Sequence, residues 1–293
     1  MKKPIVLVLV LFGIAAGAYS LASGKQAAAP KAAPPAKPAT SPPPVVPAEQ
    51  SSKEQKEATQ GPTVGEQADR FLRQMSDYLK ASKQLSFHAE IAYDDLLPSG
   101  QKLQLGASHD ILIRRPDRTY AEFQGARGSK RFWYDGKTMT LYDAAHDVYA
   151  TEQVPSTIDG MLDQVMKIYG FSPPLSDLIY SDPYTILIQN VQYGFYAGVT
   201  QIDGQRCHHL AFQEKKLDWQ IWIEDGIQPV PRKVVITYKT MPGAPQFTAT
   251  LSRWDFAAPA PDTMFTANLP PSAGRITFQA SASAQKQGKG GTQ

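Results

Sequence analysis

Cysteine is almost absent from this chain. Cys207 is the only one among 293 residues, so the sequence excludes an internal disulfide and any zinc site built from cysteines alone. The fold must therefore be held together by its hydrophobic core.

Strong charge of either sign is also lacking. Lys and Arg together number 30 and Asp and Glu 27, which gives a formal net charge of only +3. The densest basic cluster, RRPDR from Arg114 to Arg118, is typical of a solvated strand end. Nucleic-acid binding would need a dense basic stripe, so no nucleic-acid partner is expected.

Recognisable catalytic motifs are missing as well. The sequence has no Gly-x-Ser-x-Gly elbow, no phosphate-cradling glycine loop and no His-Glu-x-x-His helix. Cys207 and His209 would share a strand face, but the other candidate ligands, His88, His109 and His146, are expected on separate strands or loops. We therefore expect no catalytic residue, no metal and no cofactor, and interpret Cys207 as a buried thiol beside a hydrogen-bonded histidine. An unrecognised hydrolase that uses His209 stays open as an alternative.

The N-terminal residues have the pattern of an export signal. Two lysines precede an apolar run from Ile5 to about Ala22, and Ser20 and Ala22 fit the small-x-small rule for cleavage before Ser23. The run is also long enough to span a bilayer if it is not cut. Residues 1–22 are therefore expected to be a signal peptide or an inner-membrane signal anchor, and the rest of the chain is expected in the periplasm.

Two further segments are expected to lie outside the fold. Residues 23–62 are rich in Ala and Pro and cannot bury enough apolar surface to offset their ordering entropy, which predicts a disordered linker. This linker is either a passive spacer or, if the anchor is kept, a tether. Residues 279–293 are predicted to be a disordered tail, which leaves one folded domain at 63–278.

Helical periodicity occurs at the start and in the middle of this domain. Thr63 and Glu66 have capping-box spacing, and apolar residues from Val64 to Leu85 recur every three or four positions. The segment STIDGMLDQVMKIYGF predicts a second helix, and LSDLIYSDPYTIL predicts a short helix broken at Pro183.

The rest of the domain predicts β-strands in hairpin succession. Apolar residues alternate in SFHAEIAY, LQLGASHDILIRRP and KRFWYDGKTMTLYD, and again from FYAGVTQI to QFTATLSRWDF. Asp135-Gly136 marks a tight turn, and Asp94-Asp95 is interpreted as a solvated hairpin loop. About ten antiparallel strands exceed what a flat sheet carries without curling. We therefore predict a mainly antiparallel, highly curved half-barrel with helices covering an apolar concave face.

One strand fixes an expected direction for its side chains. In DWQIWIEDG, Trp219 and Ile221 share one face and Trp222 lies on the other. We expect Trp219 and Ile221 to face the concave side and Trp222 to lie outside, near a rim.

Five blocks of the sequence resemble a known family. They are RRPDRTYAEF, FWYDGKTMTLYD, DGQRCHHLAF, WQIWIEDGIQPVPRKVVITY and FTANLPP, in this order across nearly the whole domain. They resemble an uncharacterised family of predicted periplasmic proteins in the lipoprotein-localisation (LolA/LolB-like) superfamily. The resemblance implies a half-barrel with helices over its mouth and an apolar cavity that takes a lipid or an acylated protein. One relative in the superfamily senses mislocalised lipoproteins with the same fold.

These observations predict a periplasmic hydrophobic-ligand-binding module and not an enzyme. It would act as a carrier or sensor for lipid or lipoprotein acyl chains. A membrane-tethered envelope domain that binds a protein or senses stress without lipid transport is the alternative, and a self-packed barrel without a cavity is a third possibility. The predicted lining residues are Leu105, Ile111, Trp133, Leu141, Trp219, Ile221 and Phe247 on strands, with Leu162 and Met166 on a covering helix.

Overall fold

One open sheet of 13 strands runs through the part of the chain that the computed structural model describes, residues 63–170, 173 and 175–278. The expected export signal, linker and tail lie outside the described residues. Within the described residues, no helix is long and apolar enough to cross a membrane.

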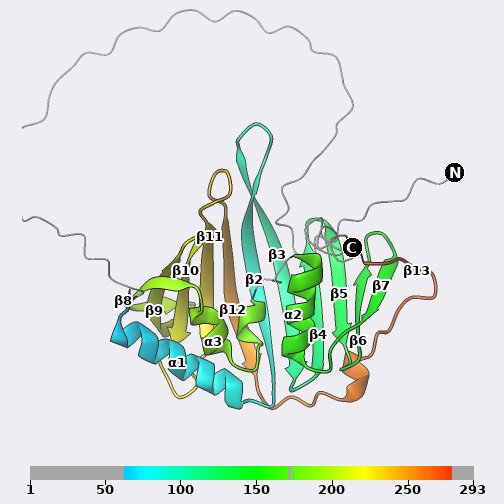
Figure 1. Cartoon of the computed structure of the whole chain (residues 1–293), viewed down its shortest axis with the longest axis horizontal. Coiled ribbons are helices and arrows are strands. Elements are labelled where there is room, and N and C mark those ends of the chain that lie inside the picture. The colour runs from blue at the N-terminus through cyan, green and yellow to red at the C-terminus, as the bar shows by residue number, and fades with distance from the viewer. Residues whose placement is uncertain (1–62, 171–172, 174, 279–293) are drawn as a thin grey trace, which may run out of the picture. The chain divides into compact units, whose positions relative to one another are not determined.

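The sheet consists of two antiparallel meanders joined edge to edge. Its strand order is β1-β8-β9-β10-β11-β12-β2-β3-β4-β5-β6-β7-β13 (Figure 1). In chain order the strands are β1 (Thr63–Val64), β2 (Gln84–Leu96), β3 (Lys102–Arg114), β4 (Arg118–Gly125), β5 (Gly128–Tyr134), β6 (Thr138–Asp143), β7 (Val148–Gln153), β8 (Val191–Ile202), β9 (Gln205–Glu214), β10 (Leu217–Glu224), β11 (Pro231–Tyr238), β12 (Gln246–Asp255) and β13 (Gly274–Arg275). The last strand of the second meander, β12, pairs with the first strand of the other, β2, which makes the sheet continuous.

This architecture confirms the predicted curved, antiparallel-dominated half-barrel. The strand number is higher than expected, in part because β1 and β13 have only two residues each and add to β8 and β7 in parallel at the two edges. Strands this short leave no alternating pattern in a sequence.

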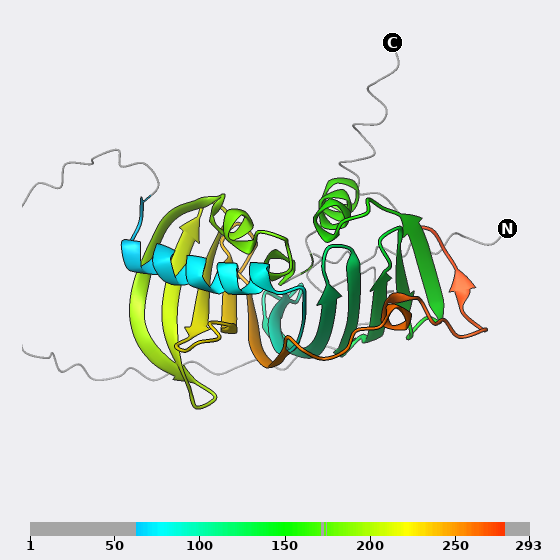
Figure 2. The ribbon, with the colours of Figure 1, turned by 90° about the horizontal axis from the view of Figure 1, so that it is seen from below.

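The helices lie against the sheet and bury their apolar stripes there. They are α1 (Glu66–Ala81), α2 (Ile158–Tyr169) and α3 (Pro183–Ile188), with short 3₁₀ turns at η1 (Ser176–Leu178) and η2 (Asp262–Phe265). Figure 2 shows α1 along the hollow of the half that contains β8 to β12, while α2 covers the half that contains β4 and β5. Each half of the sheet thus has its own covering helix.

Cross-strand register produces the continuous core beneath the helices. One row contains Leu210, Ile221, Val234, Ala249 and Ile91, each directly opposite the next on five adjacent strands. All five are buried in the main hydrophobic cluster. Trp219 and Ile221 belong to this cluster, whereas Trp222 lies on the opposite face and stacks on His209 at 4.1 Å, as the alternation predicted.

Three local predictions about helix ends are wrong. Thr63 does not cap α1, because Thr63 and Val64 pair with β8, and the helix begins at Glu66 after Gly65. Leu85 lies on β2 and not in the helical stripe. Pro183 begins α3 at its first position, where a missing N–H costs nothing, and does not break a helix.

Two predictions about polar residues are also corrected. Asp94 and Asp95 lie within β2 and form ion pairs with Lys102 and Arg127. Arg115, in the basic cluster, is only partly exposed and donates a hydrogen bond of 2.8 Å to the carbonyl of Ile179. In both cases the side chain contacts a residue on another strand or segment, which a local sequence pattern does not show.

Candidate functional site: an apolar cavity beneath helix α2

A cavity lies between α2 and the strands β3 to β6. Its volume is about 70 Å³, within about 840 Å³ of unfilled space that includes the open mouth. Apolar side chains form most of the lining, which consists of His109, Ile111, Thr119, Ala121, Phe123, Lys130, Phe132, Met139, Leu141, Met161, Leu162, Val165, Tyr169, Pro173, Leu175, Ser176, Ile179 and Phe278. The interior of this half is therefore not completely filled by its own chain.

The floor of the cavity is built by sheet register. Ile111, Ala121, Phe132 and Leu141 lie directly opposite one another on β3 to β6. Because residues directly opposite one another on neighbouring strands point to the same face, all four present their side chains to α2. Ala121 is the small member of the row, so it leaves space between its larger neighbours.

The roof comes from the apolar stripe of α2. Met161, Leu162 and Val165 are buried on this helix and line the cavity. Thr157 caps the helix by accepting a hydrogen bond of 3.1 Å from the backbone N–H of Gly160. Gly170 ends the helix in the left-handed conformation with φ 72°.

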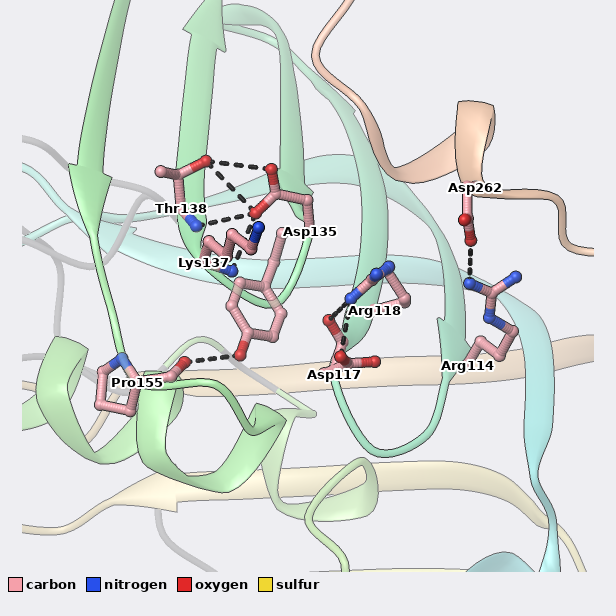
Figure 3. Close-up of polar contacts among 9 residues, drawn as sticks. Arg114, Asp117, Arg118, Asp135, Lys137, Thr138, Pro155 and Asp262 are labelled. Carbon is pink, nitrogen blue, oxygen red and sulfur yellow. Dashed lines mark hydrogen bonds and ion pairs between the residues drawn. The ribbon is translucent and has the colours of Figure 1, made fainter.

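Polar contacts at its N-terminal end attach α2 to the rest of the structure. The buried Tyr134 hydroxyl donates a hydrogen bond of 2.6 Å to the carbonyl of Pro155, just before the helix (Figure 3). Burial raises the pKa of Tyr134 to about 12, so the hydroxyl keeps its proton. Asp159 accepts bonds of 2.8 and 2.5 Å from the backbone and hydroxyl of Ser181.

One end of the cavity carries a buried ion pair. Lys130 and Asp143 face each other across β5 and β6, with 2.8 Å between Nζ and Oδ2 and side chains that are only 16% and 8% exposed. Burial is the largest single influence on the pKa of Asp143 and acts to raise it, but the hydrogen bonds and charges of Lys130 and His146 together outweigh it, so the pKa is lowered. His146 also approaches Asp143 at 3.2 Å.

Further polar side chains in the lining include His109 and Thr119. Burial lowers the pKa of His109 to about 4, so this imidazole is neutral at neutral pH. The buried hydroxyl of Thr119 has no hydrogen-bond partner among the described residues. Neither of these two side chains places a charge in the cavity at neutral pH.

The predicted lining residues separate into three sets. Ile111, Leu141 and Leu162 line the cavity. Trp133 is buried on the opposite face of β5 against Tyr120, and Met166 is 46% exposed on the outer side of α2. In each case the preceding residue in the sequence, Phe132 or Val165, lines the cavity instead, because neighbouring residues point in different directions.

The remaining four predicted residues lie elsewhere. Trp219, Ile221 and Phe247 are packed in the main hydrophobic cluster on β10 and β12, in the other half of the sheet, and Trp219 stacks on Phe212 at 4.1 Å. Leu105 lies opposite Tyr93 on β3 and packs against the same core, short of the cavity. The structure thus brings three of the nine residues together in one cavity, and the ligand-binding role of all nine stays a prediction.

Sequence reasoning did not select several lining residues, including Phe123, Lys130 and Tyr169. Phe278 was also missed, although it lines the cavity and contacts Tyr169 at a ring distance of 5.4 Å. Alternation along β4 could have indicated Phe123, because it shares a face with Thr119 and Ala121. No sequence signal connects Phe278 to α2.

The candidate catalytic residues do not form a constellation. His209 Nε2 lies 2.9 Å from the side-chain oxygen of Gln220, and burial raises the pKa of Cys207 to about 11, which keeps the thiol protonated. No group of three or more His, Cys, Asp or Glu residues among those described could hold a metal ion. The hydrolase hypothesis therefore gains no support from the geometry around His209.

A comparison with protein families gives one match. The family described as "Predicted periplasmic protein (DUF2092)" matches residues 68–279. The chain belongs to this family. The assignment confirms the expected family of predicted periplasmic proteins and agrees with the export expected from the N-terminal residues. A comparison with curated proteins gave no match.

Several solved structures are distantly similar to this chain. The lipoprotein LppX of Mycobacterium tuberculosis is 14% identical over 66% of this chain and 97% of that one, with a TM-score of 0.42. LprF of Mycobacterium bovis is 16% identical over 73% and 100%, with a TM-score of 0.41. A LolA superfamily protein of Nitrosomonas europaea is 9% identical over 68% and 97%, with a TM-score of 0.36. Likenesses this distant do not transfer a ligand to the chain.

Proposed function

We propose that the protein is a periplasmic hydrophobic-ligand-binding module that holds a lipid or lipoprotein acyl chain beneath α2. The apolar cavity between α2 and the strands β3 to β6 is the observation that carries this proposal. A self-packed core would leave no such space between α2 and these strands. The module would then act as a carrier or as a sensor of acylated molecules.

The energetics suit reversible binding. Ten methylenes removed from water contribute about 8 kcal/mol. Association costs from about 4 to 15 kcal/mol in lost freedom, so only a modest net affinity remains. A ligand held in this way can be released, which both a carrier and a sensor require.

The size of the cavity assigns a role to α2. A volume of about 70 Å³ has room for only a handful of water-sized groups, so a longer chain requires the roof to move. The roof is a helix of 12 residues whose polar attachments include those at Tyr134 and Asp159. We therefore assign α2 the role of a lid that shifts as the chain enters.

Titration with a fluorescent fatty acid tests the proposal. The unmodified protein should bind the probe saturably. Ala121→Leu fills the floor of the cavity and should weaken binding by about tenfold, which corresponds to about 1.4 kcal/mol.

Ala92→Leu is the matched control. It makes the same chemical change on β2, on the face opposite to the buried Ile91 and Tyr93. This variant should bind the probe as the unmodified protein does. Absence of saturable binding to the unmodified protein would rule the proposal out.

A further inference from the structure

The edge of the sheet at β8 is largely uncovered. Among the described residues, only β1 pairs with this edge, at Tyr193 and Gly194, and the chain then turns into α1 with a bond of 2.9 Å from Gly65 N–H to the carbonyl of Gly194. The eight residues from Phe195 to Ile202 have β9 on one side and no described strand on the other (Figure 1). A strand edge of this length has unpaired backbone donors and acceptors that another strand can satisfy.

β8 also lacks two of the usual protections of an exposed edge, charged residues and proline. Its sequence, VQYGFYAGVTQI, has no charged residue and no proline. Proteins commonly protect such edges with lysine, proline, bulges or a covering segment. A bulge at Tyr196 to Gly198 is present, with Gly198 at φ 111°, but it introduces no charge that would repel a partner.

The side chains on β8 add an apolar surface to the open backbone. Tyr193, Phe195 and Val199 are 49%, 45% and 43% exposed, and the rings of the first two lie 6.0 Å apart. By contrast, the opposite edge strand, β7, contains Glu152 and is covered at Val148 and Tyr149 by β13. Each edge is thus covered by a strand of two residues, but β8 is the longer edge strand and carries no charge.

The described part of the chain supplies no further strand for this stretch. β1 pairs with β8 only at Tyr193 and Gly194, and β13 pairs with β7 at the other end of the sheet. Pairing with a further strand would satisfy the backbone groups from Phe195 to Ile202.

We propose that β8 pairs antiparallel with β8 of a second copy of this chain. A two-fold axis near Gly198 and Val199 would bring each residue from Phe195 to Ile202 opposite a residue of the same stretch. When two copies of one strand pair near a two-fold axis, like charges on the strand come close and repel. β8 has no charged residue, so its self-pairing meets no such repulsion. The new strand would also continue the antiparallel pairing of β8 with β9 and shield Phe195 and Val199 from water.

Sedimentation velocity on the full exported chain tests this interface. From about 1 to 100 µM, the unmodified chain should move toward twice its monomer mass. Val199→Lys places one lysine from each copy near the two-fold axis, and Phe195→Lys places a lysine on each copy further along the strand. Each variant should raise the dimer dissociation constant by at least about tenfold. Ile227→Lys is the control, because Ile227 is 96% exposed in the loop after β10 and should leave the dimer unchanged.

Hydrogen exchange identifies the surface independently of these variants. Amides from Phe195 to Ile202 should become more protected as the concentration of the unmodified chain rises. Circular dichroism establishes whether each variant is folded, and if Val199→Lys fails to fold, Phe195→Lys and the exchange data decide. A chain that stays monomeric throughout, or a dimer that forms without protecting β8, overturns the proposal whether or not a lipid binds beneath α2.

Discussion

The ammonium of Lys130 lies 2.8 Å from the carboxylate of Asp143, directly across β5 and β6 at one end of the apolar cavity. Both side chains are largely buried, so each charge depends on the other for its solvation. We predict that Lys130→Met alone lowers the free energy of unfolding by about 3 kcal/mol, because Asp143 is left buried without its partner. Urea unfolding at neutral pH measures this change.

A double-mutant cycle supplies the control for the ion pair. Lys130→Met combined with Asp143→Leu removes both charges and should cost less than the sum of the two single changes. Additive effects would mean that the two residues act independently, against the observed contact.

His109 should make the stability depend on pH. Burial lowers its pKa to about 4 in the folded protein, whereas the ordinary value is 6.5, so between these values the unfolded chain binds more protons. The free energy of unfolding should therefore fall as the pH drops from 6.5 to 4, by about 3 kcal/mol at the acid limit. Urea unfolding at a series of pH values measures the slope.

Two histidine variants isolate this contribution. His109→Gln should flatten the slope between pH 6.5 and 4. His146→Gln should keep it, because the His146 side chain is 60% exposed. An unchanged slope in His109→Gln would assign the pH dependence to other groups.

Tyr134→Phe should loosen the attachment of α2. It removes the 2.6 Å hydrogen bond to the carbonyl of Pro155 and keeps the buried ring. We expect a loss of about 1 kcal/mol in the free energy of unfolding and faster hydrogen exchange in α2. Tyr142→Phe removes a comparable bond, 2.9 Å long, to Asp147 and should leave exchange in α2 unchanged. Equal effects of both variants on α2 would contradict the role of Tyr134 as an anchor.

Gly194 should not tolerate a side chain. A Cβ atom there would lie 2.5 Å from Cδ1 of the buried Phe212, so Gly194→Ala should destabilise the protein by about 1 to 3 kcal/mol through overpacking. Gly106→Ala meets no atom within 4 Å and should change the midpoint of thermal unfolding little. Equal thermal midpoints for the two variants would contradict the packing of Phe212 against β8.

Much of the fold could be predicted from the sequence, because alternation sets which strand residues share a face. Phe87, Ala89, Ile91 and Tyr93 are all buried on β2, as their spacing predicted. The helix predicted at the start of the domain is present from Glu66 to Ala81, but its boundaries depend on pairing between β1 and β8. Such long-range pairing is invisible in a local pattern.

The candidate site could be predicted only in part. Alternation places Ile111 and Leu141 on the apolar face, where both line the cavity, yet it places Trp219 and Phe247 there as well, and these two lie in the core of the other half. Periodicity identifies the face of the sheet but not the half of it that stays open. That difference depends on which helix covers each half and on small residues such as Ala121.

The lipid content of the purified protein tests the central claim most directly. The chain isolated from the cell envelope is extracted with organic solvent, and the extract is analysed by mass spectrometry. We predict that an amphiphile with an acyl chain accompanies the unmodified protein and Ala92→Leu, and that Ala121→Leu carries much less of it. An unmodified protein free of lipid, or equal amounts in the two variants, would contradict the binding of an acyl chain beneath α2.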